Sequence, residues 1–302
     1  MSFSHNIADY PEGIVLSVDK PYRWTSADVI RKLKWRAIRH FGKKNLKVGH
    51  AGTLDPLATG VLLVCIGNAC KRAQELQDHD KEYIARIRFG ATTPSYDLEK
   101  EVDRRFPFEH ITADAVRAAL PAFLGEQEQV APLFSAKSVD GVRAYELARK
   151  LYRAGRFAEL DSAALDTLQR NKIVISELEL LDFHDAGRDS LPGDSVSCVP
   201  SGLVSGGPLP LPVSGGGHAP GRESLPTSAS SRINVADTSA LGLPEAVIRI
   251  ACSKGTYIRA FARDLGEALG SGAHLSGLIR FRSGAYRIED ALSLDQALAL
   301  FA

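Results

Sequence analysis

The densest group of chemically useful residues in the 302-residue chain lies between Gly49 and Gly60, in the sequence Gly-His-Ala-Gly-Thr-Leu-Asp-Pro-Leu-Ala-Thr-Gly. A continuous apolar run, Val61–Ile66, follows directly. Several glycines and a proline beside such a run predict a tight loop held by a strand, a common setting for catalytic groups. Asp55 offers a carboxylate for nucleophilic or general-base chemistry, and His50 offers an imidazole. Taken alone, the pattern favours a turn in which Asp55 accepts backbone hydrogen bonds and His50 packs or caps.

Basic residues gather around this loop. Between Lys20 and His50 the chain has ten lysines and arginines and one acid, Asp28, although the whole chain carries a net charge of only +1. This local excess suits a phosphate-binding face, because each neutralised phosphate releases counterions. A solvated basic helix face explains the same charge, and charge alone favours that simpler interpretation.

The elements that must position these residues include both strands and helices. Hydrophobic periodicity and capping residues predict strands at 14–18, 61–66, 81–89, 172–183 and 245–252, and helices at 26–41, 112–125, 256–270 and 294–301. In the third strand Tyr83, Ala85, Ile87 and Phe89 share one face. The pattern contains no regular βαβ repeat, so the expected class is α+β.

One segment differs from everything around it. Residues 184–243 contain 10 Gly, 7 Pro and 11 Ser, and no Phe, Tyr or Trp. Such a composition cannot bury enough apolar area to offset the entropy of ordering, so we expect a disordered insertion. Because strand patterns flank it on both sides, we expect it to interrupt one domain, with the two strands paired as neighbours.

The run Gly49–Val64 closely resembles the signature of the TruB family of tRNA pseudouridine synthases. Further motifs agree with this family in order and spacing, at 13–26, 80–83, 252–259 and 272–280. The resemblance covers about residues 13–183 and 245–290. It implies a pseudouridine synthase fold, with a mixed, mainly antiparallel central sheet and flanking helices, and a single catalytic domain over 1–302.

The resemblance also implies a cofactor-free and metal-free isomerisation of uridine in RNA. The essential aspartate of the family corresponds to Asp55, which adds covalently to the base or ribose or assists proton removal. Arg259 corresponds to the arginine that pairs with this aspartate, and Tyr83 to the tyrosine that stacks on the flipped uracil. Without the resemblance, a surface salt bridge and a core aromatic would be the simpler interpretations of Arg259 and Tyr83.

Four more residues match substrate-binding positions of the family. Tyr257 and Leu278 correspond to residues that line the uracil pocket, and His50 to the residue that wedges into the RNA loop. Lys20 corresponds to a lysine near the active site, with either a structural role or a phosphate contact. Leu278 alone would be interpreted as core.

The expected partner is the T-arm of tRNA, with the basic stretch Arg31–Lys47 along its backbone. Residues 132–155, with a hairpin turn predicted at Asp140-Gly141, resemble the mobile thumb of the family. The chain ends at Ala302, so we expect no C-terminal domain of the PUA type. The longest apolar run is too short to span a bilayer, and four cysteines without a CxxC pair exclude a disulfide scaffold. We therefore expect a cytoplasmic monomer without an obligate protein partner.

The leading hypothesis is a synthase that modifies uridine 55 in the T-loop of tRNA. Two alternatives remain at this stage. One is a pseudouridine synthase that acts on another RNA, and the other is a non-catalytic RNA-binding or RNA-folding protein that keeps the pocket.

Overall fold

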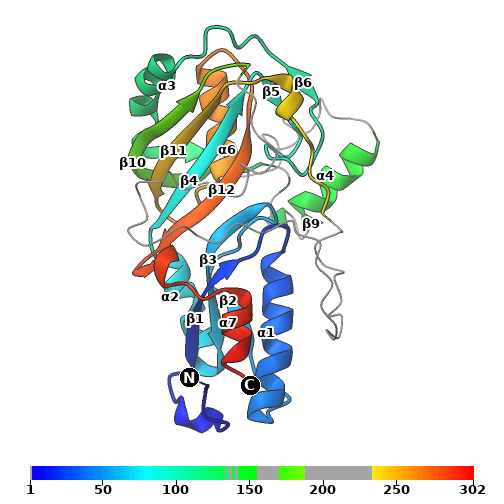
Figure 1. Ribbon diagram of the computed structural model, residues 1–302, viewed down its shortest axis with the longest axis vertical. Helices are drawn as coiled ribbons and strands as arrows, with labels where there is room; N and C mark the ends of the chain where they lie inside the picture. The colour runs from blue at the N-terminus through cyan, green and yellow to red at the C-terminus, as the bar shows by residue number, and fades with distance from the viewer. Residues whose placement is uncertain (1, 133, 135–137, 140–141, 155–169, 188–232) are drawn as a thin grey trace, which may run out of the picture.

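We describe the fold from a computed structural model over residues 2–132, 134, 138–139, 142–154, 170–187 and 233–302 (Figure 1). The main sheet comprises β1 (Ile14–Lys20), β2 (Val48–His50), β3 (Ala58–Ile66), β4 (Lys81–Phe89), β7 (Gly125–Gln129), β10 (Asn171–His184), β11 (Glu245–Cys252), β12 (Ala273–Ser283) and β13 (Tyr286–Arg287). Two small pairs join β5 (Ala91–Thr92) to β6 (Arg104–Arg105) and β8 (Ser138–Val139) to β9 (Val142–Arg143). The helices are α1 (Ser26–Phe41), α2 (Ala73–Asp78), α3 (Ala113–Ala119), α4 (Ala144–Arg153), α6 (Ile258–Ala268) and α7 (Leu294–Ala299).

The main sheet extends along the molecule in the order β1-β3-β12-β4-β11-β10-β7, with β2 beside β3 and β13 beside β12 (Figure 1). β12 runs parallel to β3. The other pairings of this sheet are antiparallel in the described part of the chain. The predicted α+β class with a mixed, mainly antiparallel sheet is therefore confirmed. Helix α6 packs on β12 and β4, whereas α1 and α7 pack together near the opposite end of the sheet.

Helix α1 shows how local sequence sets an element's limits. Thr25 is its N-cap and forms a capping box with Asp28, in which each side chain bonds to the other's backbone N–H. Gly42 ends the helix with φ 61°, in the left-handed region that favours glycine. Its apolar residues Val29 and Leu33 are buried and join one hydrophobic cluster that also includes β1, β4 and α7. The helix therefore has one buried face and one solvent face.

The two strands that flank the low-complexity segment are neighbours, as predicted. β10 and β11 pair antiparallel from Ile175 opposite Cys252 to His184 opposite Glu245. Residues 188–232 lie outside the described part of the chain. Residues 233–243, which we had included in the expected insertion, contain packed positions: Ala236 is buried and its N–H donates to the carbonyl of Leu98 at 2.7 Å.

Two predicted boundaries change. The predicted loop 49–60 is shorter than expected, because residues 58–60 already belong to β3, where they pair with Leu278–Arg280 of β12. Pro121 ends α3 early, and a 3₁₀ turn over Leu120–Phe123 replaces the last predicted helical turn. The turn at 140–141 lies outside the described residues, but β8 and β9 pair on either side of it.

Two strands of the path β1-β3-β12-β4-β11-β10-β7 were not predicted. β12 occupies the centre of the sheet, yet Ser276 and Gly277 interrupt its apolar pattern and its register shifts twice against β4. β7 has the polar sequence Gly-Glu-Gln-Glu-Gln at the sheet edge, where backbone pairing with β10 holds it. In both cases the hydrophobic alternation that indicates a strand is missing.

Candidate active site

The loop that carries Asp55 is held at its centre by the beginning of α1. The hydroxyl of Ser26, the first residue of this helix, accepts from the N–H of Leu54 at 2.9 Å and donates to its carbonyl at 3.1 Å. The N–H of Ala58 donates to the carbonyl of Asp55 at 3.1 Å, which closes a tight turn around Pro56. These contacts fix the backbone on either side of the carboxylate.

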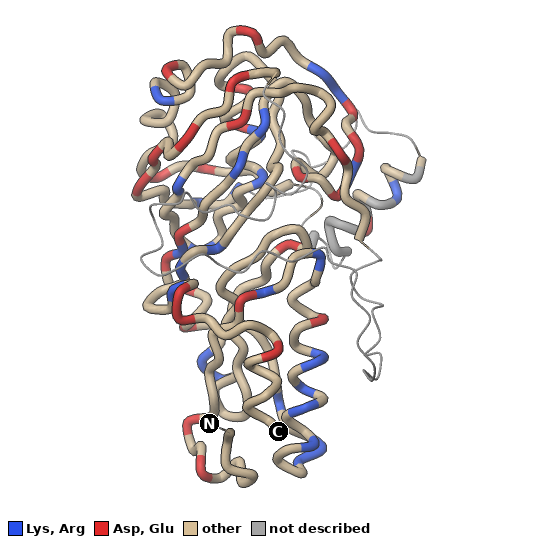
Figure 2. The backbone as a smooth tube through the Cα atoms, viewed as in Figure 1, with Lys and Arg blue, Asp and Glu red and all other residues tan. Residues whose placement is uncertain are grey.

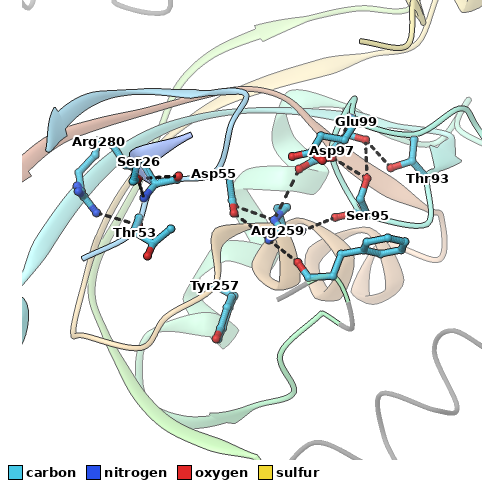
Figure 3. Close-up of polar contacts among 12 residues, drawn as sticks. Ser26, Thr53, Asp55, Thr93, Ser95, Asp97, Glu99, Tyr257, Arg259 and Arg280 are labelled. Atoms are coloured by element: carbon cyan, nitrogen blue, oxygen red, sulfur yellow. Dashed lines mark hydrogen bonds and ion pairs between the residues drawn. The ribbon is translucent and has the colours of Figure 1, made fainter. Parts of the chain in front are cut away.

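Arg280 of β12 holds both ends of the same loop. This side chain is fully buried, and its guanidinium donates to the carbonyls of Gly52 at 3.1 Å and Val61 at 2.7 Å. It also donates to the carbonyl of Thr53 at 3.4 Å (Figure 3). Gly60 has φ 99°, and a Cβ there would lie 2.3 Å from the carbonyl oxygen of Arg280. Sequence reasoning did not single out Arg280 as functional, although it ends the last matching motif, 272–280.

Asp55 and Arg259 form a bidentate ion pair. The Nε of Arg259 lies 2.9 Å from one carboxylate oxygen of Asp55, and an Nη lies 3.0 Å from the other. The Arg259 side chain is 6% exposed and that of Asp55 35%, so the carboxylate is the more accessible partner of the pair. Figure 3 shows the two side chains facing each other. Two parallel charge-assisted bonds fix the carboxylate's orientation as well as its charge. The pairing of Arg259 with Asp55 that the resemblance implied is therefore present.

Further groups around Arg259 hold it from the opposite side. Its guanidinium donates to the carbonyls of Ser95 at 3.1 Å and Phe134 at 3.0 Å, and lies 3.7 Å from the carboxylate of Asp97. Asp97 is itself oriented, because its carboxylate accepts from the Ser95 hydroxyl at 2.6 Å and from the N–H of Glu99 at 2.9 Å (Figure 3). Sequence reasoning missed this acidic cluster, since residues 95–99 and Arg259 are far apart in the sequence and no motif links them.

The charges in this cluster shift one another's titration. Burial lowers the pKa of Arg259, but the carboxylates of Asp55, Asp97 and Glu99 outweigh burial and the pKa lies above its ordinary value. Burial raises the pKa of Asp97, although Arg259 opposes this. Burial and the neighbouring Asp97 raise the pKa of Glu99 to about 7. Arg259 therefore stays cationic at every physiological pH and can stabilise the negative charge of Asp55.

A cavity of about 280 Å³ opens in front of the ion pair. Asp55, Tyr83, Tyr257, Arg259 and Leu278 all contribute to its lining. The structure thus brings together five of the seven predicted site residues, from the loop before β3, from β4, from the region where α6 begins and from β12. The volume lies just below the usual range for small-ligand pockets, roughly 300–1,000 Å³.

Tyr83 and Tyr257 reach the cavity in different ways. Tyr83 is 8% exposed and belongs to the hydrophobic core. Burial raises the pKa of its phenol. Tyr257 is the N-cap residue of α6, and its backbone N–H and carbonyl are both bonded to the side-chain amide of Gln129, at 2.8 and 3.1 Å. The aromatic rings thus line the cavity from anchored backbone positions.

Lys20 has a structural environment. It is fully buried, and its ammonium donates to the carbonyls of Pro21 at 2.9 Å, Trp24 at 2.6 Å and Pro56 at 3.2 Å. Burial lowers the pKa of Lys20 to about 7, against the attraction of Asp55. Because its three donors are used within the protein, the structure favours the structural role of Lys20 over the phosphate contact, the two roles that the sequence left open.

His50 lies in β2, partly buried, at the start of the loop and outside the residues that line the cavity. Burial and the charge of Arg280 lower the pKa of His50, so its imidazole is neutral at pH 7. Its Nδ1 is buried and has no hydrogen-bond partner among the described residues. A neutral ring at the edge of the site suits an apolar wedge better than a general acid.

In the described residues, no group of three or more His, Cys, Asp or Glu side chains is arranged to hold a metal ion. The helices of the described ranges are also too short or too polar to cross a membrane.

Comparison with known proteins relates the chain to one group of RNA-modifying enzymes. A model of the TruB family pseudouridylate synthases, N-terminal domain, matches residues 39–187. The tRNA pseudouridine synthase B of Phocaeicola vulgatus is 44% identical over 95% of this chain and 92% of its own length. That of Flavobacterium johnsoniae is 37% identical over 95% of both chains, and that of Deinococcus radiodurans 36% identical over 93% and 77%.

Solved structures agree on the fold. A chain in the crystal structure of a Cbf5-Nop10-Gar1 complex matches with a TM-score of 0.55 and 21% identity, over 97% of this chain and 56% of that one. A chain of an H/ACA RNP bound to a substrate RNA containing 2′-deoxyuridine matches with a TM-score of 0.52 and 19% identity, over 95% and 53%. This chain spans little more than half the length of those solved chains. With a fold shared at this level and sequence identity above 30% across nearly the whole chain, the protein belongs to the TruB family of pseudouridylate synthases.

Proposed function

We propose that the protein is a tRNA pseudouridine synthase that converts uridine 55 of the T-loop to pseudouridine. The observation that carries this proposal is the ion pair of Asp55 and Arg259 on the wall of a cavity that Tyr83 also lines. The names of the relatives, tRNA pseudouridine synthase B, support tRNA as the substrate class.

The target uridine must leave its base stack to reach the cavity. Extrusion of a nucleotide costs a few kcal/mol, and stacking on an aromatic ring returns about 1–3 kcal/mol per base. We assign this stacking to Tyr83, while Tyr257 and Leu278 confine the uracil from other sides. We propose that the ring of His50 fills the space that the extruded base leaves in the RNA, since this ring is neutral and lies at the edge of the site.

The chemistry exchanges one bond for another. The N1–C1′ bond breaks, the uracil rotates, and a C5–C1′ bond forms; C5 loses its proton and N1 gains one. Atoms and electrons balance, so the reaction itself requires no redox partner or cofactor. Asp55 either adds covalently to the base or ribose or assists removal of the C5 proton, and each role needs an anionic carboxylate close to the sugar.

Arg259 and the loop contacts prepare Asp55 for this role. Arg259 holds the carboxylate in one orientation through two hydrogen bonds, which reduces the reorganisation needed during reaction. Lys20 and Arg280 fix the backbone of the loop through its carbonyls and act as positioning residues. In this proposal, the groups that act on the uridine are side chains of the polypeptide.

Tritium release tests the proposal. In vitro transcribed tRNA labelled with tritium at C5 of uridine releases label to water only when C5 loses its proton. We expect release from wild type, at most background release from Asp55→Asn, and nearly unchanged tRNA affinity in that variant. The exposed Asp290→Asn serves as the matched control and should behave as wild type.

Two results would overturn the proposal. Wild-type protein that binds tRNA without releasing tritium would be an RNA-binding or RNA-folding protein. Release from another RNA, with none from an unmodified T-arm hairpin, would identify a synthase with a different substrate.

We further infer that the catalytic unit is one domain, acting as a monomer without a protein partner in the cytoplasm. One hydrophobic cluster contains residues from Ile14 to Phe301, which supports a single core. Cys65, Cys70 and Cys252 are free thiols, as expected in a reducing compartment. Light scattering coupled to size exclusion should give one chain mass, and a dimer mass would contradict the inference.

A further inference from the structure

The outward face of α1 carries a row of cations that the catalytic cavity does not use. Arg31, Lys34, Arg36 and Arg39 are exposed along the helix, and Lys43 continues the row after the helix ends. Figure 2 shows Lys and Arg positions recurring along α1. We call these five residues the cationic face of α1. Apart from Arg31, which pairs with Asp28 at 2.7 Å, none forms an ion pair in the described part of the chain.

An exposed tryptophan lies within this row. Trp35 is 54% exposed, the largest such fraction among the large hydrophobic residues that the structure describes as exposed. The guanidinium groups of Arg39 and Arg36 lie 4.7 and 5.6 Å from its ring centroid. Such cation–π contacts restrict the freedom of both arginines while leaving their N–H groups in solvent. The arrangement presents two partly ordered guanidinium groups to an anion.

We propose that the cationic face of α1 is a second RNA-binding surface, which contacts the phosphates of a helical RNA stem while the target uridine occupies the cavity. This inference rests on the proposed function, because it takes the substrate to be a structured RNA. Guanidinium and ammonium groups neutralise phosphates without reading bases, so the surface supplies affinity rather than sequence choice. Trp35 holds Arg36 and Arg39 in place for this contact.

The position of α1 relative to the cavity supports a single continuous RNA. Ser26, at the beginning of the helix, is bonded to Leu54, the neighbour of Asp55. At 1.5 Å per residue, Arg36 and Arg39 lie about 15–20 Å farther along the helix axis. An A-form RNA stem of several base pairs is long enough to cross this distance. A stem that leaves the cavity along α1 therefore reaches the cationic face.

The buried side of α1 argues against a membrane as the partner. A basic helix that lies on a bilayer needs an apolar face free to enter the lipid. In α1 that face, with Val29, Leu33, Ala37 and Phe41, is already buried in the protein core. Trp35 alone is too small an apolar surface to anchor the helix, so charge complementarity favours a polyanion.

The test compares Arg36→Gln/Arg39→Gln with a control that removes the same charge elsewhere, Arg105→Gln/Lys172→Gln on β6 and β10. Both control side chains belong to exposed residues. Affinity for full-length unmodified tRNA is measured by fluorescence anisotropy from 50 to 300 mM salt, alongside kcat and KM. We expect the α1 double variant to bind about tenfold more weakly at low salt and to lower the salt slope by roughly 1.5–2, with kcat retained. The control should match wild type.

Two further arms locate the contact. On a T-arm hairpin with its stem shortened to two base pairs, wild type and the α1 double variant should bind equally, because the stem no longer reaches the helix. Trp35→Ala should weaken tRNA binding severalfold, and Trp35→Phe, which keeps an aromatic face for the arginines, should restore most of it.

The outcomes separate this inference from the proposed function. Unchanged tRNA affinity and salt slope in Arg36→Gln/Arg39→Gln, with normal turnover, would overturn the inference and leave the function standing. Salt-sensitive binding through α1 without turnover by wild type would overturn the proposed function and leave the inference standing. Trp35-dependent binding of wild type to anionic phosphatidylserine vesicles would also overturn it, in favour of a membrane surface.

Discussion

The ammonium of Lys20 lies 3.2 Å from the carbonyl oxygen of Pro56, the residue that follows Asp55. This contact joins the end of β1 to the loop that carries the reactive carboxylate. Lys20 also donates to the carbonyls of Pro21 and Trp24. Its ammonium therefore connects the segment that precedes α1 to the Asp55 loop. A buried charge used in this way positions the loop without touching the substrate.

Loss of this contact should slow catalysis more than it weakens binding. Lys20→Met keeps the length of the side chain and removes its donors, so the Asp55 loop gains freedom. We expect kcat to fall by about 10²-fold, the scale on which a misplacement of about 1 Å acts, with tRNA affinity little changed. Steady-state tritium release and anisotropy measure the two quantities, with Lys172→Met as control. A rise in KM alone would indicate that Lys20 binds RNA.

Replacement of Arg259 should separate rate from affinity even more clearly. Arg259→Lys keeps the charge but loses the two-pronged bond to Asp55, and Arg259→Ala loses both. We expect kcat to fall by about 10²–10³-fold in the lysine variant and further in the alanine variant, with a much smaller loss of tRNA affinity. Arg263→Lys is the matched control, because Arg263 lies one turn farther along α6 and pairs with Asp264 instead. Equal losses in rate and affinity would contradict the assigned role.

Glu99 should make stability depend on pH. Its pKa is raised to about 7 by burial and by Asp97, so between about pH 4.5 and 7 the native state binds more protons than the unfolded state. The free energy of unfolding therefore contains a contribution from Glu99 that is lost as pH rises through this window. In Glu99→Gln this loss is absent. We expect the melting temperature of the variant, relative to wild type, to rise between pH 4.5 and 7.5; a constant difference would show that Glu99 titrates normally.

Removal of residues 190–231 should leave the fold and activity intact. The N–H of Gly187 donates to the carbonyl of Gly242 at 3.0 Å, so the ends of the segment already meet at the base of the β10–β11 pair. Closing a shorter loop costs less entropy, which favours the folded state by about 1 kcal/mol. Thermal melting and tritium release check both expectations.

A longer deletion serves as the contrast. Removal of 190–238 also takes away Ala236, bonded to Leu98, and Thr238, whose hydroxyl accepts from Arg88 at 2.8 Å. We expect this protein to be less stable than the shorter deletion. Equal stability of the two would mean that the contacts of Ala236 and Thr238 contribute little.

Elements with local signals could be predicted from the sequence. Thr25 and Gly42 mark the limits of α1, and alternation gives β4 and the face that carries Tyr83. β12 escaped prediction because bulges and polar residues break its period, and its place beside β3 depends on pairing across more than 200 residues of chain. Neither cause is visible in a window of neighbouring residues.

The site divides in the same way. Asp55, Tyr83 and Arg259 were identified by motifs, and their meeting at one cavity agrees with that prediction. Arg280 acts by donating to backbone carbonyls of the Asp55 loop, and Asp97 acts as a second carboxylate beside Arg259. Only the folded chain brings these groups within reach of one another. Positioning residues of this kind lack a sequence signal of their own, because almost any buried arginine or aspartate would look alike.

The central position of β12 has a consequence for biosynthesis. β12 lies between β3 and β4, although both of those strands precede it by about 200 residues. During translation the edges of β3 and β4 that pair with β12 therefore stay unpaired until residue 283 has emerged. Arg280 cannot bond to the Asp55 loop before then. A nascent or proteolysed chain that stops short of this strand has no assembled active centre. An assembled active centre therefore indicates that synthesis has passed residue 283.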